Sequence, residues 1–471
     1  MGGVFSSCGM SFPLYGLDRH GPLMSLQELA GELLEWMRRQ DPGLEAELYL
    51  ARGEERGVEM RDGRLDSVQH GSSEGAGLRL LAEGRVGFAS GGGVTPESIQ
   101  DLYRRAYAQL GHLESDPARD FPAAPAASPD RDLERSLWDE SLFSQRIEQF
   151  AARLEASHGA ALGTDRRLSA VLRAGYGESR GETVIASTRG VLASDRGTSA
   201  SVGFSVLARE SSEVQVGSAC RSACSAADLD FDAVAVQAAQ RAAALLGGRK
   251  LPGAARAVIF DPWAAGEVLD LVANLLCADQ VQKGKSLLAG KLGAQVGSDL
   301  VTFVDDPRRP GGLGSCLYDD EGCPTSAKIM IERGVVREYF YDTYTARKDG
   351  RPGNASAGRG SYKGLPSPTH SNFFLSPGTM SRDAIISGTR DGLLVMEIMG
   401  MHMADPISGE FSVGVSGLAV ANGRLIHPVK KAMISGNLLD LLARVDAVGG
   451  DLTFYGGLGA PTFRVAALNV A

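Results

Sequence analysis

Near its start, the chain alternates apolar and polar residues with the period of an α-helix. Leu26, Leu29 and Leu33 recur three and four residues apart within LQELAGELLEWMRRQ. This spacing places them on one face of a helix. Ser25 precedes the run, and serine is a favoured N-cap residue because its hydroxyl accepts a hydrogen bond from the first turn. The pattern therefore predicts an amphipathic helix that begins after Ser25.

Between residues 46 and 92 the period changes to that of β-strands. The segment alternates short apolar runs with Asp-Gly and Glu-Gly pairs, as in AELYLARGEERGVEMRDGRLDSVQHGSSEGAGLRLLAEGRVGFASGG. Such pairs are typical of tight turns between antiparallel strands. A helix is expected next, because Thr95 suits an N-cap and Pro96 suits the first helical position. The segment is predicted to be an antiparallel meander followed by a helix.

The order of helix, meander and helix then occurs a second time. Residues 115–129 are rich in Ala, Pro and Asp and have neither period, so they are interpreted as a linker. Beyond the linker we expect a helix from Leu142 to Ser157, strands from Leu168 to Val216 and a helix from Phe231 to Leu246. No sequence repeat accompanies this order, so common packing rules explain it as well as a duplication does.

The third part of the chain is dominated by strands and turns. ARAVIF is expected to be a buried strand, and Pro262 opens a helix, WAAGEVLDLVANLLCADQV. Hairpins are predicted at the Asn-Gly pair 422–423 and at the Arg-Gly pair 333–334. The predicted fold class is α+β, with N-terminal helix and antiparallel-meander layers followed by a β-rich C-terminal domain that has one helix near its start.

These patterns give a domain plan. A chain of 471 residues exceeds one ordinary hydrophobic core, so several domains are expected. The predicted parts are an N-terminal extension (1–24), an N-terminal α+β domain (25–114), a linker (115–135), a middle α+β domain (136–248) and a β-rich C-terminal domain (249–471).

Composition and charge exclude several classes of function. The net charge of −9 and the pI near 5.4 provide no basic surface for nucleic acid. Residues 1–24 lack both a basic start and an unbroken apolar stretch, so a signal peptide is not expected, and Met24 is an alternative start. No membrane segment is expected either. The six irregularly spaced cysteines are expected to be reduced thiols, which indicates a cytoplasmic protein.

The histidines offer little for a zinc site. The seven histidines are far apart in sequence, and none forms an HExxH pair. His402 is the best candidate ligand, because Asp405 and Glu410 lie close to it in MGMHMADPISGEFS. The alternative is that this loop is held by turn hydrogen bonds, which its Gly residues favour.

Two acidic clusters have a similar pair of interpretations. Asp305-Asp306 and Asp319-Asp320-Glu321 contain the oxygen ligands that hard cations prefer, and paired carboxyls can also act as acid and base. Each cluster adjoins Pro or Gly, where Asp commonly accepts hydrogen bonds from its own turn. Turn stabilisation is the favoured interpretation.

Longer phrases in the third part of the chain carry a family resemblance. They are, in order, GKSLLAGKLGAQVGSDLVTFVDDP, YDDEGCPTSAKIMIERGVVREYFYDTYTARKDG, GNASAGRG and SGEFSVGVSGLAVANGRLIHPVKKAMISGNLLDLL. Together they resemble the C-terminal domain of the TldD/PmbA metallopeptidases, also known as modulators of DNA gyrase. The resemblance runs from about Leu251 to Ala471, whereas the N-terminal half resembles the family only in its helix and meander layout.

The chain departs from the family at the zinc ligands. TldD-type members have an HExxxH helix before the GxSxxxGxxG phrase and a later cysteine. Counting back from Ser286 places the two histidines at Leu269 and Asn274 and the glutamate at Asp270. No cysteine follows Cys323. Leu and Asn cannot replace imidazole ligands, so the departure indicates the TldE/PmbA branch, with no zinc in this chain and zinc in a TldD-type partner.

The resemblance implies a subunit that encloses small or unfolded peptides for cleavage by a zinc-bearing partner, and it implies no catalytic residue in this chain. Candidate chamber residues lie in the matching loops, where the alternative role is turn stabilisation: Ser286, Asp319, Glu321, Tyr344, Arg347, Asn354, Arg359 and Phe411.

Two alternative functions remain open. One is an independent hydrolase with an unusual metal site at His402 and the neighbouring carboxylates. The other is a homodimer that binds peptides or a small molecule without a peptidase partner.

Overall fold

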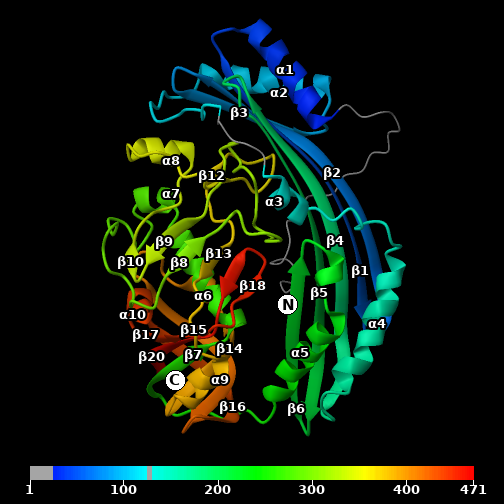
Figure 1. The fold of residues 1–471 in the computed structure, drawn as a ribbon, viewed down its shortest axis with the longest axis vertical. Helices are drawn as coiled ribbons and strands as arrows, with labels where there is room; N and C mark the ends of the chain where they lie inside the picture. The colour runs from blue at the N-terminus through cyan, green and yellow to red at the C-terminus, as the bar shows by residue number, and fades with distance from the viewer. Residues whose placement is uncertain (1–24, 125–129) are drawn as a thin grey trace.

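The computed structural model describes residues 25–124 and 130–471. The predicted extension 1–24, with Met24, lies outside the described residues, as do residues 125–129 of the predicted linker. A long curved sheet from the N-terminal half lies beside a β-rich C-terminal domain (Figure 1). The predicted α+β fold class is therefore confirmed.

The six N-terminal strands form one antiparallel sheet in the order β3-β2-β1-β4-β5-β6, which we call the half-barrel sheet. The strands are β1 (Glu45–Arg61), β2 (Arg64–Ala82), β3 (Arg85–Gly92), β4 (Leu168–Ser187), β5 (Leu192–Glu210) and β6 (Glu213–Ala223). The predicted meander 46–92 corresponds to β1, β2 and β3. Because β1 also pairs with β4, from Glu47 opposite Ser187 to Arg61 opposite Arg173, the first and middle segments share this sheet.

Four helices cover one face of the half-barrel sheet, namely α1 (Leu26–Gln40), α2 (Pro96–Leu110), α4 (Glu148–Leu162) and α5 (Phe231–Ala244). Alternate residues of β1 point to this face. Leu48 and Leu50 share a core with α1 and α2, whereas Val58 and Met60 share a second core with α4 and α5. Two cores therefore lie along one side of a single sheet.

The helix starts follow their capping residues closely. The Ser25 hydroxyl accepts from the Glu28 amide at 3.2 Å, and the Thr95 hydroxyl accepts from the Ser98 amide at 3.2 Å. The prediction for the middle segment was wrong at both ends of its first helix, because α4 begins at Glu148 rather than near Leu142 and ends at Leu162 rather than at Ser157. Phe143 has a φ of 67°, which a right-handed helix does not accommodate.

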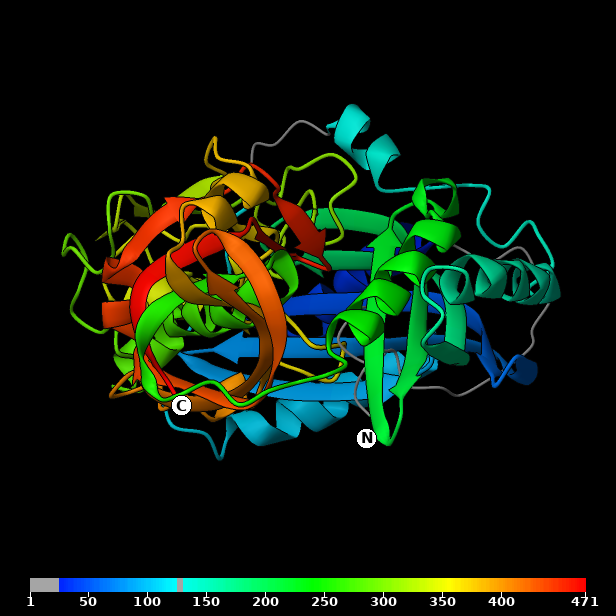
Figure 2. The same cartoon turned by 90° about the horizontal axis from the view of Figure 1, so that it is seen from below.

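The C-terminal domain contains two six-stranded sheets. The first closes on itself through pairing of its strands β16 and β20, and Figure 2 shows this ring of strands. Its strands are β7 (Ala254–Phe260), β14 (Asp391–Met399), β15 (Glu410–Ala421), β16 (Arg424–Asn437), β17 (Val445–Val448) and β20 (Phe463–Val470). The second sheet comprises β8 (Phe303–Asp305), β9 (Lys328–Glu332), β10 (Val335–Val336), β13 (Phe373–Leu375), β18 (Thr453–Tyr455) and β19 (Leu458–Ala460), and a short separate pair is β11 (Ala357–Gly358) and β12 (Ser367–Pro368).

Both predicted hairpins of this domain are confirmed. Asn422 and Gly423 have φ values of 51° and 75° and connect β15 to β16. Arg333 and Gly334 have φ values of 48° and 78° and connect β9 to β10. Positive φ at both central residues matches the twist of the flanking strands, which explains why these dipeptides specify the turns.

The predicted helix near the start of the domain is α6 (Pro262–Leu275), which packs its apolar face into the largest core. The prediction continued this helix to Val281, but α6 ends at Leu275 and a separate short helix, α7 (Ala278–Gln282), follows Cys277. Three further helices of six residues were not predicted, because so short a run shows no clear periodicity. They are α8 (Thr343–Lys348), α9 (Arg382–Ser387) and α10 (Leu438–Ala443). The remaining helical turns are α3 (Arg131–Ser136), η1 (Ala226–Asp228) and η2 (Met401–Met403).

Within the described ranges, no helix is both long and apolar enough to cross a membrane.

Candidate functional site

Helix α6 carries the positions at which the resemblance places zinc ligands. Leu269 is only 1% exposed and belongs to the C-terminal core, whereas Asp270 and Asn274 are exposed. The Asn274 amide nitrogen donates to the Asp270 carbonyl at 2.8 Å. Five residues along a regular helix rotate a side chain by about 140° beyond a full turn. Leu269 and Asn274 therefore point in different directions, and neither side chain is a zinc ligand.

The other candidate ligands do not form a metal site. Among residues 25–124 and 130–471, no group of three or more His, Cys, Asp or Glu side chains is placed to hold a metal ion. His402 is exposed in η2. Asp405 accepts hydrogen bonds from the Ile407 and Ser408 amides at 2.8 and 3.2 Å, and Glu410 accepts from Asn437 at 3.0 Å. The donors present in this part of the chain do not fit a catalytic zinc ion.

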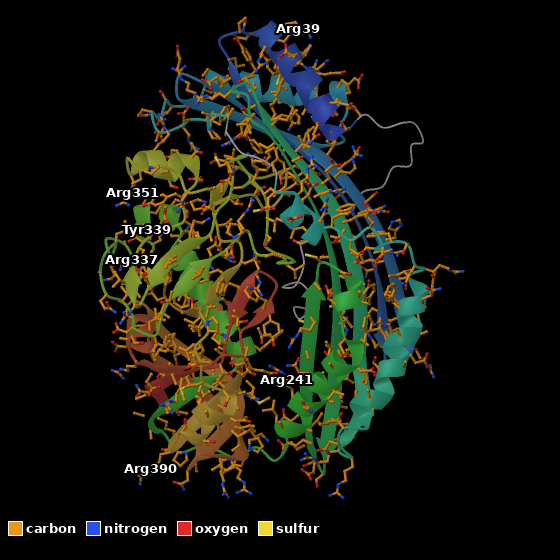
Figure 3. The ribbon with its side chains drawn as sticks, viewed as in Figure 1. Arg39, Arg241, Arg337, Tyr339, Arg351 and Arg390 are labelled. Atoms are coloured by element: carbon orange, nitrogen blue, oxygen red, sulfur yellow. The ribbon has the colours of Figure 1, made fainter. Side chains whose placement is uncertain are left out.

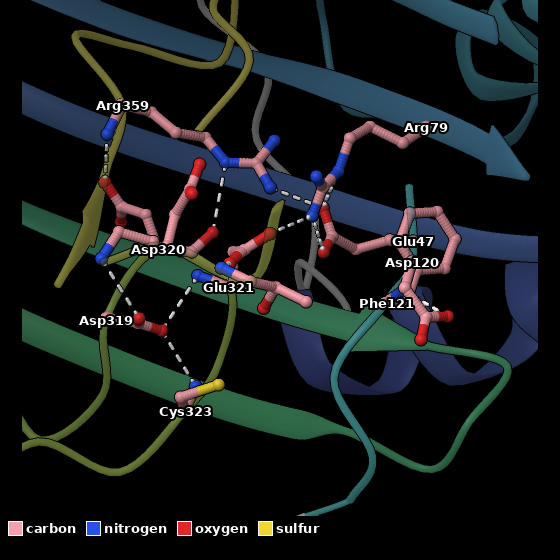
Figure 4. Close-up of polar contacts among 12 residues, drawn as sticks. Glu47, Arg79, Asp120, Phe121, Asp319, Asp320, Glu321, Cys323 and Arg359 are labelled. Atoms are coloured by element: carbon pink, nitrogen blue, oxygen red, sulfur yellow. Dashed lines mark hydrogen bonds and ion pairs between the residues drawn. The ribbon is translucent and has the colours of Figure 1, made fainter. Parts of the chain in front are cut away.

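A buried network of charged side chains joins the half-barrel sheet to the C-terminal domain (Figure 4). Arg79 of β2 donates to Glu47 of β1 at 2.8 Å and to Glu321 at 3.1 Å. Arg359 forms a second ion pair with Glu47. The side chains of Glu47, Glu321 and Arg359 are at most 2% exposed. Two candidate residues that are far apart in sequence therefore meet here, Glu321 and Arg359.

Pairing determines the charge of this network. Burial by itself raises the pKa of Glu47, but Arg79 and Arg359 outweigh burial, so the pKa lies below its usual value. Burial opposes the charge of Arg79, but Glu47 and Glu321 raise the pKa of its guanidinium. Glu47 and Arg79 are therefore both charged inside the protein.

The acidic cluster at 319–321 forms a turn, as predicted. Asp319 accepts hydrogen bonds from the amides of Glu321 and Cys323 at 3.0 and 2.9 Å, and from the Ala357 amide at 3.1 Å. Asp320 accepts from the Arg359 amide at 2.6 Å. The turn interpretation is thus confirmed for this cluster. Glu321 also pairs with Arg79 in the charged network.

The carboxylates of the second acidic cluster also accept hydrogen bonds from loop residues. Asp305 accepts from the amide and the hydroxyl of Ser371 at 2.7 and 2.9 Å. Asp306 accepts from the Arg308 amide at 2.9 Å. The turn interpretation is therefore confirmed for Asp306, whereas Asp305, the last residue of β8, holds a segment that is distant in sequence.

Two candidate residues of α8 contact the predicted linker. Tyr344 donates to Asp116 at 2.8 Å, and Arg347 forms an ion pair with Asp120. The neighbouring Phe121 is 1% exposed, and its ring lies under the Arg79 guanidinium at 4.9 Å. This part of the linker is therefore packed between the two halves of the molecule.

The remaining candidates support loops and core. The Ser286 hydroxyl is buried and donates to the Leu275 carbonyl at 2.6 Å. Asn354 accepts from the Tyr341 amide at 3.0 Å. Phe411 is 4% exposed in the C-terminal core. Of the eight candidate chamber residues, Asp319, Glu321 and Arg359 are brought together, Tyr344 and Arg347 face the linker, and the other three hold separate structural contacts.

Sequence reasoning missed Glu47 and Arg79. Each stands in an otherwise apolar stretch, AELYL and LRLL, at a position that alternates with buried leucines. A charge in such a strand must find a partner, because an unpaired buried charge is strongly destabilising. A charged residue within an apolar strand pattern was therefore the sequence signal that could have identified Glu47 and Arg79.

A second contact between the two halves lies at Arg241 of α5 (Figure 3). Arg241 donates to Asp261 at 2.9 Å, and its guanidinium lies 5.6 Å from the Trp263 ring centroid. The Trp263 ring meets Tyr455 edge to face at 4.8 Å. Charged and aromatic contacts therefore fasten the middle segment to the start of α6 and to β18.

The face of the half-barrel sheet opposite its helices is lined by small residues. Gly53 lies beside Gly181, which lies beside Gly197, and further along Gly57 and Gly177 form the next such row with Ser201. Side chains this small leave the backbone open to close approach by another segment.

Comparisons with known proteins match each of the three parts of this architecture. Family models described as PmbA/TldA metallopeptidase domain 1, central domain and C-terminal domain match residues 46–110, 140–246 and 253–471. The metalloprotease PmbA of Escherichia coli O157:H7 is 26% identical over 431 residues, with 91% of this chain and 92% of the relative covered. A metalloprotease of Methanocaldococcus jannaschii is 26% identical over 422 residues, with 86% of this chain and 90% of the relative covered.

Solved structures agree with these matches. A crystal structure of a candidate modulator of a DNA gyrase from Thermotoga maritima aligns with a TM-score of 0.87 and 26% identity, covering 95% of this chain and all of that one. The crystal structure of TldE from Thermococcus kodakarensis aligns with a TM-score of 0.85 and 20% identity, covering 94% and 100%, which establishes likeness of fold. The chain therefore belongs to the PmbA/TldD metallopeptidase family.

Proposed function

We propose that this chain is the zinc-less subunit of a TldD/TldE-type cytosolic peptidase, in which it encloses and binds small or unfolded peptides. The observation that carries the proposal is on α6, where Leu269 is buried in the core and Asn274 bonds its own helix. A peptidase of this kind needs a metal-bound water, and this helix offers no imidazole to hold the metal. Cleavage therefore belongs to a zinc-bearing relative that acts as partner.

Peptide binding by strand addition fits the surfaces near α6. β18 is an edge strand of its sheet and contacts α6, and Thr453 to Tyr455 are partly exposed. An edge strand offers backbone N–H and C=O groups to an extended peptide, which gives affinity with little sequence selectivity. The Gly and Ser rows of the half-barrel sheet leave room for a backbone to approach. Together these features favour peptides of varied sequence.

Zinc content and cleavage test the proposal together. The isolated chain is purified, its bound zinc is measured, and cleavage of a casein-derived peptide is followed with and without a TldD-type partner from the same genome. We expect zinc far below one ion per chain, no cleavage by the chain alone, and chelator-sensitive cleavage by the mixture that exceeds that of the partner alone.

Two results would contradict the proposal. Stoichiometric zinc with chelator-sensitive cleavage by the isolated chain would make it an independent hydrolase. Failure of the two proteins to co-elute, with this chain eluting as a dimer of itself that binds peptide, would favour the homodimeric binding protein.

A further inference from the structure

The turn at 316–323 is held by the half-barrel sheet through a carboxyl group. Asp195 of β5 accepts hydrogen bonds from the backbone amides of Leu317 and Tyr318 at Oδ2, at 2.9 and 3.1 Å, and the Leu317 amide also lies 3.2 Å from Oδ1. The half-barrel sheet makes polar contacts with this turn through Asp195 and through the Glu47 and Arg79 network described above. We call these contacts together the junction.

The junction contains more carboxyl groups than cations. Glu47, Asp195, Asp319, Asp320 and Glu321 meet there, and Arg79 and Arg359 are the guanidinium groups that pair inside it. Further titratable groups face these carboxyls from the surrounding elements: Tyr49 on β1, Arg308 before the turn, Cys316 and Cys323 at its two ends, Asp342 before α8, and the pair Asp305 and Lys328.

Arg308 does not remove this excess. Its guanidinium donates to Asp130 at 2.9 Å, so it brings a carboxylate of its own to the edge of the junction. With all five central carboxyl groups ionised, the two internal guanidiniums leave an uncompensated negative charge in a largely buried space. Such a charge is costly, and the protein avoids it by keeping protons on some of the carboxyls.

We propose that proton binding stabilises the junction. The contact between the half-barrel sheet and the 316–323 turn is most stable while Asp195 and its neighbouring carboxyls are protonated, and it becomes less stable as they ionise. The proposal concerns this chain alone. It does not depend on the peptidase role, because its test needs neither a partner nor a substrate.

The environment of each carboxyl supports this assignment. Burial raises the pKa of Asp195 to about 7, against the opposing effect of the Tyr318 and Leu317 amides. Burial also raises the pKa of Asp320 to about 6, although Arg359 lowers it. Burial followed by repulsion from Glu321 raises the pKa of Asp319.

The direction of the pH effect follows from these values. From about pH 4 to about pH 7, the formed junction holds a proton on Asp195 that a solvated carboxyl has already released. Raising the pH through this window therefore favours the separated state, whereas lowering it favours the formed junction. Each proton involved changes the opening equilibrium by at most about tenfold per pH unit.

Hydrogen exchange of the full chain tests directly how the stability of the junction depends on pH. Exchange of the Leu317 and Tyr318 amides is measured from about pH 5 to about pH 8 and corrected for the intrinsic pH dependence of exchange. The amides of β15 serve as an internal reference, because they lie outside the junction. We expect protection at Leu317 and Tyr318 to fall by up to about tenfold per pH unit below pH 7, while β15 stays constant.

Variants assign the effect to a residue. Asp195→Asn keeps one acceptor oxygen for the two amides but cannot ionise, so protection should fall less steeply with pH than in the wild-type protein, with only the neighbouring carboxyls contributing. Asp451→Asn is the matched control, because Asp451 also accepts a backbone amide, that of Thr462 at 2.9 Å, in another part of the C-terminal domain. It should retain the wild-type pH dependence.

The result is decisive in the wild-type protein alone, even where a variant fails to fold. Constant protection of Leu317 and Tyr318 across the range, or an equal fall in β15, would overturn the proposal. So would an Asp195→Asn variant that retains the wild-type fall in protection.

Discussion

Single charged residues decide how the two halves of this molecule meet. Glu47 and Arg79 stand on strands whose neighbouring residues are apolar, and both are buried. Removing two charges from water is costly unless they pair and form hydrogen bonds. Arg359 and Glu321, contributed by the C-terminal domain, complete that pairing. The strands by themselves pair Glu47 with Arg79, and docking of the C-terminal domain adds Arg359 and Glu321 to the buried network.

Arg359→Met tests the energetic weight of this pairing. The variant removes one of the two cations that face Glu47, and breaking a buried pair is expected to lower the free energy of unfolding by about 3 kcal/mol. Urea unfolding gives the value. Arg337→Met is the control, since Arg337 pairs with Glu332 at 2.9 Å with both side chains exposed, and its loss should cost less than about 1 kcal/mol. Equal losses in the two variants would disprove a special role for the buried network.

At the scale of elements, glycines determine how closely helices approach the half-barrel sheet. Gly217 lies in β6, where α5 crosses it, and a Cβ added there would lie 2.2 Å from the Ala242 backbone nitrogen. Gly197 lies in the adjacent strand β5, where the nearest atom to an added Cβ is 3.9 Å away. An added methyl group therefore has room at Gly197 but not at Gly217.

These glycines form a matched pair of variants. Gly217→Ala forces α5 away from the sheet, and overpacking of this kind lowers stability by about 1 to 3 kcal/mol. Gly197→Ala brings its Cβ only into ordinary van der Waals contact, at 3.9 Å from the Leu137 carbonyl oxygen, and it restricts the unfolded chain, so stability should change by less than about 1 kcal/mol, toward gain. Midpoints of urea unfolding measured side by side distinguish them. Similar destabilisation by both substitutions would contradict the packing argument.

At the scale of the whole molecule, the half-barrel sheet unites two segments that the family models treat as separate domains. β1 pairs with β2 on one side and with β4 on the other. Two hydrophobic cores lie on one face of the sheet. The first segment contains β1 and β2, whereas β4, the other neighbour of β1, belongs to the middle segment. The N-terminal half should therefore fold as one unit.

Two fragments test this unity. Residues 25–114 alone leave β1 as a long unpaired edge, so we expect aggregation or no cooperative unfolding transition. Residues 25–248 contain the complete half-barrel sheet and both cores, so they should unfold cooperatively. Circular dichroism during heating, with size-exclusion chromatography, provides the measurement. Cooperative unfolding of 25–114 by itself would show that the first segment is an independent domain.

Much of the fold could be predicted from local patterns. Capping at Ser25 and Thr95, the meander of β1 to β3, the start of α6 at Pro262 and the turns at Asn422 and Arg333 all follow from residues close together in sequence. The short helices α8 to α10, the break between α6 and α7 and the bounds of α4 could not be predicted, because contacts and backbone conformation outside the local pattern decide them. Local patterns involve residues only a few positions apart, so they predict the presence of a helix or strand better than the residues at which it begins and ends.

The sequence by itself determined the family and the absence of imidazole at Leu269 and Asn274, because identity at a position requires no knowledge of its neighbours. Only the tertiary structure decided which charges meet. The pairing of Glu47 with Arg359, 312 residues away, depends on how the half-barrel sheet docks on the C-terminal domain. The physical reason is that burial and charge pairing are properties of the assembled core, where residues distant in sequence determine each other's environment.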